Sequence, residues 1–128
     1  MPHLSIDFQR LKQDIVDLSS IGRRENQGLY RMAFSAADIQ ARQWLQQRIR
    51  DAGLELYVDG AANIHARLDW DGQRPSVMTG SHLDTVPGAG HLDGALGVLT
   101  GLECLRCIKE QQVALRLPLE SVAFTDEE

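Results

Sequence analysis

Apolar positions recur at helical spacing in three stretches of the chain, and each stretch predicts an amphipathic helix. The first runs from an N-cap at Asp7 towards Gly22, and its apolar face consists of Phe8, Leu11, Ile15 and Leu18. The second begins after Ser35 and ends at Gly53, and its stripe consists of Ala37, Ala41, Trp44, Leu45, Ile49 and Ala52. The third has apolar residues at successive i+3 steps, namely Leu96, Leu99, Leu102, Leu105 and Ile108. Residues 22–34 have no clear period and are predicted to form a loop.

Elsewhere the apolar spacing changes to two, which predicts β-strands. Two strands are expected at residues 54–58 and 64–68, with a turn between them, and two more at 77–81 and 119–125. A glycine-rich loop at residues 87–94 leads into the third helix. The order strand, helix, strand after residue 77 is typical of a crossover connection in an α/β sheet. Ligands of such sheets bind beyond the carboxyl ends of the strands.

Composition narrows the class of protein. The chain has 128 residues, 43% of them apolar, which predicts one folded domain or part of one. Its net charge of −5 argues against nucleic-acid binding, and the absence of an 18-residue apolar run argues against a membrane span. Two cysteines, Cys104 and Cys107, are expected to pack in a helix and fit a reducing cytoplasm.

His82 and Asp84 follow the third predicted strand. Residues two apart in an extended chain point to the same side, so these two side chains are expected to face one site. A metal-bound histidine usually donates its second ring N–H to a carboxylate, which suits His82 as a ligand supported by Asp84. Taken alone, this motif is better explained by a solvated pair at a strand end, because His-x-Asp is common by chance.

Further carboxylates lie at the start of the third predicted helix and beyond the end of the fourth predicted strand. Asp93 and Gly94 open the third helix, where an aspartate either bridges cations or caps the helix. Asp126, Glu127 and Glu128 follow the fourth strand, and such neighbouring carboxylates repel one another unless a cation or a shared proton compensates. Alternatively, they form an acidic, solvent-exposed segment. Nitrogen and carboxylate ligands without thiolates favour zinc or manganese, so the clusters together predict a metal site.

Longer motifs surround these residues. They are residues 80–86 (GSHLDTV), 90–94 (GHLDG), 97–98 (GV), 102–103 (LE) and 123–128 (AFTDEE), preceded by 41–45 (ARQWL), 52–54 (AGL), Asp59 and Asn63. Together they resemble the N-carbamoyl-L-amino-acid hydrolases, a group that includes β-ureidopropionases and allantoate amidohydrolases. This group belongs to the larger clan of di-metal aminopeptidases and carboxypeptidases. Two positions depart from the family pattern, because Ala62 and Ala89 stand where the family usually has glycine.

The resemblance implies an α/β, zinc-peptidase-like catalytic domain, of which residues 1–128 are the N-terminal part, with a mixed sheet flanked by helices. It implies that His82 binds one of two divalent metal ions, zinc or manganese, that Asp93 bridges both, and that Glu128 binds the other. It also implies that Glu127 is the general base and that Asp84 orients His82.

The implied function is hydrolysis of non-peptide carbon–nitrogen bonds in linear amides or amidines, such as N-carbamoyl-L-amino acids or ureido acids. Family members are about three times as long as this chain, beyond the usual size of one domain. They carry two further histidine ligands and a dimerisation domain, so we expect homodimers of the longer proteins and no activity from residues 1–128 alone. Two alternatives are a dipeptidase or aminopeptidase of the same clan and a catalytically inactive metal-binding or interaction module.

Overall fold

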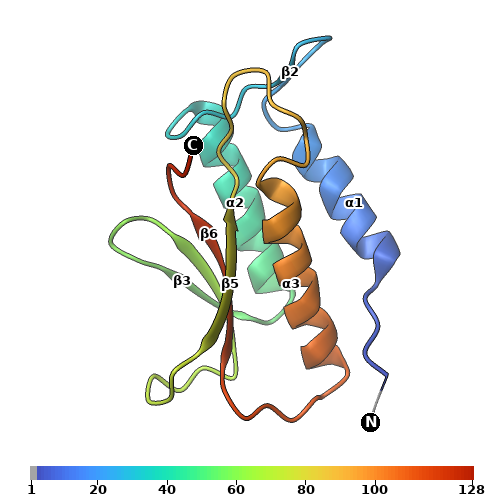
Figure 1. Ribbon diagram of the computed structural model, residues 1–128, viewed down its shortest axis with the longest axis vertical. Coiled ribbons are helices and arrows are strands. Elements are labelled where there is room, and N and C mark those ends of the chain that lie inside the picture. The colour runs from blue at the N-terminus through green and yellow to red at the C-terminus, as the bar shows by residue number, and fades with distance from the viewer. Residues whose placement is uncertain (1–2) are drawn as a thin grey trace.

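The computed structural model describes residues 3–128 and confirms the predicted α/β architecture (Figure 1). Its elements follow the order α1 (Phe8–Ser19), β1 (Arg23–Arg24), β2 (Gly28–Leu29), α2 (Ala36–Asp51), β3 (Glu55–Val58), β4 (Ile64–Leu68), β5 (Val77–His82), α3 (Ala95–Glu110) and β6 (Leu119–Phe124). None of the helices within residues 3–128 is long and apolar enough to cross a membrane.

The main sheet is mixed and has four strands in the order β3-β4-β6-β5. Strand β4 is antiparallel to its two neighbours, β3 and β6, whereas β5 runs parallel to β6 and is joined to it through α3. Gly80 of β5 is opposite Val122 of β6 in this register. Because β5 and β6 are parallel, their carboxyl ends meet at the same edge of the sheet, where the acidic motifs were predicted to converge.

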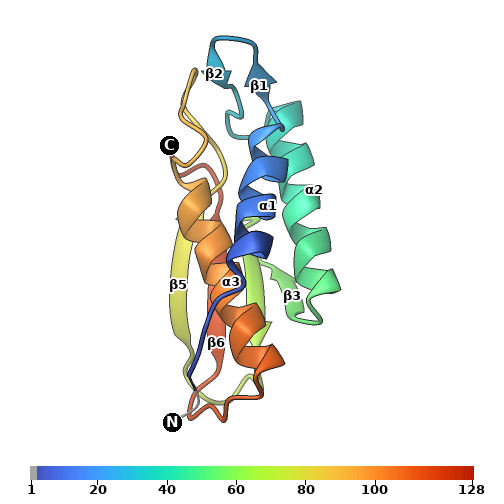
Figure 2. The same cartoon turned by 90° about the vertical axis from the view of Figure 1, so that its right-hand side faces the viewer.

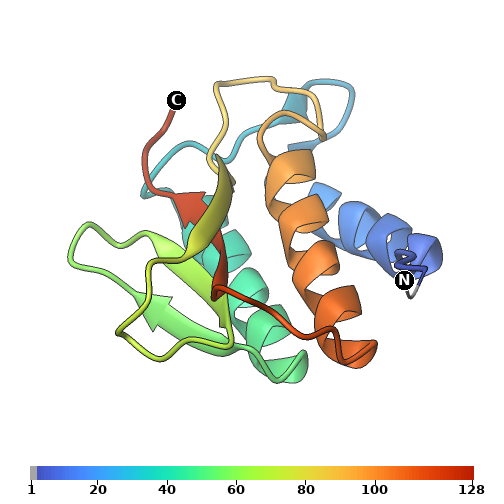
Figure 3. The same cartoon turned by 60° about the horizontal axis from the view of Figure 1, so that its bottom comes forward.

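Helices α2 and α3 cover one face of the sheet, and α1 packs against α3 (Figures 2 and 3). The apolar core lies between the sheet and these helices and includes Ile64 and Ala123 from the strands and Leu45, Leu99 and Leu102 from the helices. The predicted apolar stripes therefore face the core for the most part. Burial of these side chains drives the sheet and helices together and leaves the strand ends free for polar groups.

The predicted helix starts agree with the structure. The side chain of Asp7 accepts a hydrogen bond from the Arg10 amide, and the Ser35 side chain accepts one from the Asp38 amide. Phe8 was predicted on the buried face of α1 but is 61% exposed. It is the first residue of its helix, so its side chain lies beyond the end of the core that covers Leu11 and Leu18.

The prediction of a loop for residues 22–34 is wrong in part. Strands β1 and β2 form a short antiparallel hairpin in which Arg23 pairs with Leu29. Leu29 then pairs with Ala89 of the glycine-rich loop through two backbone hydrogen bonds of 2.9 and 3.0 Å. Strands of two residues are too short to produce a period in the sequence, so the hairpin left no pattern.

Candidate metal centre

Three elements bring the predicted site residues to one end of the molecule. His82 is the last residue of β5, Asp93 lies in the loop before α3, and Glu127 and Glu128 follow β6. Because β5 and β6 are adjacent parallel strands and α3 connects them, the start of α3 also lies at this edge (Figure 1). The crossover topology therefore gathers residues that are as far apart as 82 and 128 in the sequence.

The carboxylates surround one nitrogen of the histidine ring. His82 Nε2 lies 3.4 Å from Glu127 Oε2, 3.6 Å from Glu128 Oε1 and 3.9 Å from Asp93 Oδ1. One ligand atom each from His82, Asp93 and Glu128 lies within 4.8 Å of the others. Tetrahedral ligands at 2.0–2.2 Å from a zinc ion are about 3.4 Å apart, so small side-chain rotations would bring these three atoms to coordination distance.

The histidine ring is oriented by the backbone. His82 Nδ1 lies 2.8 Å from the carbonyl oxygen of Asp84. A carbonyl oxygen can only accept, so Nδ1 carries the proton and Nε2 is the free ligand nitrogen. The ring also packs against Gly94, which has a φ of +68°. A Cβ at this position would overlap the imidazole and displace it. These two contacts aim Nε2 at the carboxylates.

Asp84 is buried, and its carboxylate contacts the backbone of Glu128. Its Oδ2 accepts a 2.9 Å hydrogen bond from the Glu128 amide, while Oδ1 lies 3.7 Å from His82 Nδ1, beyond hydrogen-bond distance. Oδ1 has no hydrogen-bond partner among the described residues. In this structure, therefore, the Asp84 carboxylate fixes the backbone of Glu128, and the Asp84 carbonyl fixes the ring of His82.

The charges at this edge are unbalanced. Within residues 3–128, no lysine or arginine lies within 4.0 Å of the carboxylates of Asp93, Glu127 or Glu128, and the partner that all three share is the His82 ring. Side by side, these carboxylates repel one another, and a divalent cation would remove that repulsion. The nitrogen-and-oxygen donor set, without thiolates, fits zinc or manganese.

A second group of residues supports the segment that follows β6. The Thr125 amide donates to Asn63 Oδ1 at 2.8 Å, and the Arg42 guanidinium donates to the Thr125 hydroxyl at 3.2 Å. Asn63 is held in turn by the carboxylate of Asp59 through bonds of 2.9 and 3.0 Å. The neighbouring Ala62 has a φ of +65°, a conformation that favours glycine. This conformation explains why glycine suits the same position in the family that the sequence motifs resemble.

Some residues near the site gave no signal in the sequence. Arg31 was not singled out, yet it is fully buried and donates to the Leu83 carbonyl between His82 and Asp84. Only the fold brings it there from a segment without periodicity. His65 of β4 lies between the carboxylates of Asp59 and Glu120, 3.0 and 3.1 Å from its ring nitrogens. The predicted ligands His82, Asp93 and Glu128 are gathered elsewhere.

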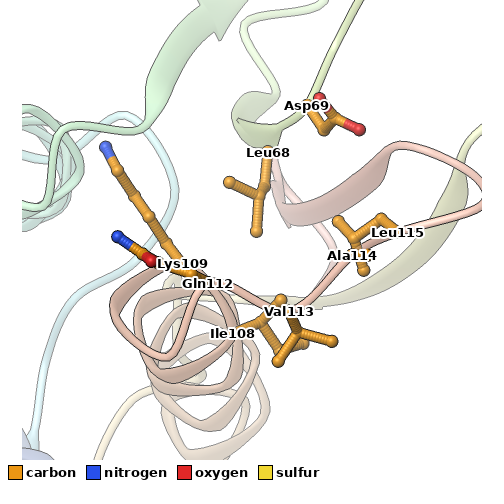
Figure 4. Close-up of a pocket in the computed structure, with 8 residues that line it drawn as sticks. All are labelled: Leu68, Asp69, Ile108, Lys109, Gln112, Val113, Ala114 and Leu115. Carbon is orange, nitrogen blue, oxygen red and sulfur yellow. The ribbon is translucent and has the colours of Figure 1, made fainter.

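Two cavities differ in their relation to the site. One of about 280 Å³ lies directly beside it, lined by Met32, Ala33, Asp84, Thr85, Val86, Pro87, Asp126 and Glu128. The other, of about 410 Å³, is formed around the opposite end of α3 (Figure 4) and is lined by five apolar side chains together with Asp69, Lys109 and Gln112. The first cavity offers room for a small molecule next to the carboxylates.

Comparison with known proteins agrees with the motif analysis. Residues 63–128 match the model of peptidase family M28. The chain is 39% identical over 126 residues to an N-carbamoyl-L-amino acid amidohydrolase of Geobacillus stearothermophilus, which covers 96% of this chain and 30% of that protein. It is 34% identical over 128 residues to a ureidoglycolate hydrolase of Arabidopsis thaliana, with 98% and 26% covered.

Solved structures give the same result. A hydantoinase/carbamoylase family amidase from Burkholderia ambifaria superimposes with a TM-score of 0.91 at 40% identity. The match covers 98% of this chain and 31% of that structure, so the chain spans about 30% of the length of the relatives that it matches. The resemblance predicted from the motifs around His82, Asp93 and Glu128 is confirmed. The chain belongs to peptidase family M28, and it is similar over nearly all of its length to the amidohydrolases of the hydantoinase/carbamoylase group.

Proposed function

We propose that this chain provides the N-terminal part of the catalytic domain of a metal-dependent hydrolase that acts on non-peptide carbon–nitrogen bonds. The observation that carries the proposal is the convergence of His82 Nε2, Asp93 and Glu128, whose ligand atoms lie within 4.8 Å of one another. Similarity to amidohydrolases named for N-carbamoyl amino acids and ureidoglycolate supports small linear amides as the substrate class.

In the longer enzyme we assign two divalent ions, zinc or manganese, to this edge of the sheet. His82 would bind one ion, Glu128 the other, and Asp93 both. Bound there, the ions would supply Lewis-acid polarisation of the substrate carbonyl and would lower the pKa of water. The residues of this chain would contribute a fixed imidazole nitrogen and two carboxylates, oriented by the carbonyl of Asp84 and by the hydrogen bond from the Glu128 amide to the Asp84 carboxylate.

Glu127 is assigned the proton transfers. Its side chain is 53% exposed, and its Oε2 lies 3.4 Å from His82 Nε2, so it borders the ligand atoms while remaining open to a substrate. In this role the carboxylate takes a proton from the attacking water and passes it to the departing nitrogen. For an N-carbamoyl amino acid, the products would be the amino acid, ammonia and carbon dioxide.

Peptide hydrolysis is the second candidate activity, because the matching family model is that of a peptidase family. Sequence identities of 34–39% to amidohydrolases favour the non-peptide substrates. We further propose that the longer protein acts in the cytoplasm as a homodimer, without a membrane or nucleic-acid partner, in keeping with the net charge of −5. Its lid and dimerisation domain and the rest of its catalytic domain would lie outside residues 1–128.

The metal centre is tested by titrating the purified chain with Co²⁺, Zn²⁺ and Mn²⁺. Binding is measured by calorimetry and, for Co²⁺, by the visible spectrum. We expect saturable binding that His82→Ala abolishes. His91→Ala is the matched control, because His91 is an exposed histidine of the neighbouring loop and is not among the three clustered ligands. Unchanged binding by His82→Ala, or no binding by the wild-type chain, would contradict the proposal.

The substrate class is tested in a chimera in which this chain replaces the matching segment of the Geobacillus stearothermophilus amidohydrolase. Ammonia release from N-carbamoyl-L-amino acids, and its loss in Glu127→Gln, is the expected result. Cleavage of dipeptides with no release of ammonia would favour the second candidate activity instead.

A further inference from the structure

Arg31 is a fully buried cation for which the proposed chemistry gives no role. It follows the β1–β2 hairpin in a segment that contributes no metal ligand. Its guanidinium donates three hydrogen bonds, all to backbone carbonyls: Nε to Leu83 at 2.7 Å and Nη1 to Leu18 and Ile21 at 3.0 Å each. Its Nη2 has no partner among the described residues.

The backbone of Arg31 contacts the same segment as its side chain. The Arg31 amide donates to the Thr85 hydroxyl at 3.0 Å, and the Thr85 amide donates to the Arg31 carbonyl at 2.9 Å. Arg31 therefore holds the two consecutive peptide groups between Leu83 and Thr85. It holds the Leu83–Asp84 group through its carbonyl and the Asp84–Thr85 group through its N–H.

These contacts determine where the histidine ring points. A peptide group is planar, so fixing the N–H of Thr85 also fixes the carbonyl of Asp84 on the opposite side of the same plane. That carbonyl is the acceptor, at 2.8 Å, for His82 Nδ1. The buried guanidinium anchors Arg31 to three backbone carbonyls, and the chain of contacts continues from the Arg31 backbone through one rigid peptide group to the imidazole. It leaves Nε2 directed at Asp93 and Glu128.

An ordinary structural arginine would be paired with a carboxylate at this depth. Arg106 is such a case, because its Nη1 lies 2.5 Å from Asp14 Oδ2 in the interface between α1 and α3. No carboxylate of the described residues lies within 4.0 Å of the Arg31 guanidinium, and burial lowers its pKa while the charges of Asp38 and Asp84 oppose that change. A buried cation without a carboxylate partner is costly, so its charge must be compensated by the three carbonyls, two of which lie at the C-terminal end of α1 and the third beside the metal ligand His82.

We propose that Arg31 is a positioning residue for the metal ligand His82, acting through the peptide groups of residues 83–85. This inference rests on the proposed metal site. The guanidinium aligns the Leu83 carbonyl, the Arg31 backbone aligns the Asp84 carbonyl, and the latter holds His82 in the tautomer whose Nε2 is free to bind a cation. Partners that orient a metal ligand in this way typically change metal affinity by about 10–100-fold when they are removed.

The test compares two variants. Arg31→Met keeps length but removes charge and donors, whereas Arg31→Lys keeps the charge but has all its donors on one nitrogen, which cannot take the places of both Nε and Nη1. Arg106→Met is the matched control, since it also removes a buried arginine but contacts neither Leu83 nor His82. Thermal melting by circular dichroism records the stability of each variant. Co²⁺ affinity is then measured at a temperature at which every variant is folded.

We expect Arg31→Met to bind Co²⁺ about 10–100-fold more weakly than the wild type and Arg31→Lys to be intermediate, whereas Arg106→Met loses stability but keeps its affinity. Affinity within twofold of the wild type in a folded Arg31→Met variant would overturn the inference. If Arg31→Met does not fold, the same criterion is applied to Arg31→Lys, and an affinity within twofold of the wild type again overturns the inference.

A second measurement needs no metal. Nitrogen-15 NMR of the metal-free chain distinguishes the two neutral tautomers of His82, and we expect the Nδ1–H form in the wild type and in Arg106→Met. Arg31 variants should show a mixture of tautomers. A wild-type His82 protonated on Nε2 would overturn the inference even if every variant unfolds. Failure of the wild-type chain to bind Co²⁺, with the tautomer still sensitive to Arg31, would instead count against the proposed function.

Discussion

His82 is held by the backbone of Asp84 and not by its carboxylate. The ring Nδ1 lies 2.8 Å from the Asp84 carbonyl oxygen but 3.7 Å from the nearer carboxylate oxygen. The carboxylate instead accepts a hydrogen bond from the Glu128 amide, so one residue restrains a ligand at the end of β5 and another in the segment after β6. The two functional groups of Asp84 thereby connect the end of β5 with the segment that follows β6.

Replacing Asp84 should weaken metal binding through Glu128. Asp84→Ala removes the acceptor of the Glu128 amide, and we expect a loss of about 10–100-fold in Co²⁺ affinity, as for other groups that orient ligands. Asp84→Asn keeps an acceptor oxygen and should lose less. Asp126→Asn is the control, because it removes a charge from the same acidic segment without breaking the bond to Glu128. Equal effects of Asp84→Ala and Asp126→Asn would mean that charge alone matters.

Gly94 is required because the ring of His82 occupies the space of a side chain. A Cβ at this position would overlap the imidazole, and the φ of +68° is unfavourable for any other residue. We expect Gly94→Ala to displace the ring and to weaken Co²⁺ binding at least about tenfold, by analogy with other losses of ligand orientation. Gly90→Ala, in the same loop, meets no atom within 4 Å and should bind like the wild type. Loss of affinity in both variants would point to general loosening of the loop.

The stability of the chain should depend on pH through Glu103. Burial opposes ionisation of this carboxyl, but hydrogen bonds from Arg10, Cys107 and the Asp7 amide outweigh it, so the pKa of Glu103 is held below its usual value. A lowered folded-state pKa stabilises the fold above the unfolded pKa of about 4.3, and this contribution is lost as the pH falls through the folded value. The free energy of unfolding should therefore decline as the solution becomes more acidic than about pH 5.

Glu103→Gln should lower the free energy of unfolding at pH 7 by about 1–3 kcal/mol, the cost of losing charged hydrogen bonds, and should flatten the acidic decline. Glu110→Gln is the matched control, since Glu110 pairs with the same Arg10 but its side chain is 55% exposed. Exposed pairs contribute about 0–1 kcal/mol. Urea denaturation at several pH values measures both variants, and an unchanged pH dependence in Glu103→Gln would refute the assignment.

The elements with clear apolar periods were predictable from the sequence, because burial on one face leaves a repeat. The helix caps at Asp7 and Ser35 and the sheet strands follow from such local rules. The β1–β2 hairpin does not follow from local rules, since its strands have two residues each and Leu29 pairs with Ala89, 60 positions later in the chain. Local rules contain no information about contacts of this kind.

The same division applies to the site. The candidate ligands His82, Asp93 and Glu128 were visible because their chemical types recur beside strand ends and a helix start. Arg31 was not, because an isolated arginine in an aperiodic segment gives no sign that it will be buried beside residue 83. Its position becomes evident only when the chain has folded.

The polypeptide of residues 1–128 is expected to bind one metal ion and to catalyse no turnover. His82, Asp93 and Glu128 offer three donors, which is the number of protein ligands that a catalytic zinc ion usually has. Two ions that shared Asp93 would have only two protein ligands each, so the second should bind weakly. Glu127 would then face a single ion without the second one that the proposed two-metal chemistry uses. The measurement is the stoichiometry of Zn²⁺ and Mn²⁺ binding, together with ammonia release from N-carbamoyl-L-amino acids. Turnover of about 1 per second or more, within the ordinary range of enzymes, would show that one ion and the residues of this chain suffice.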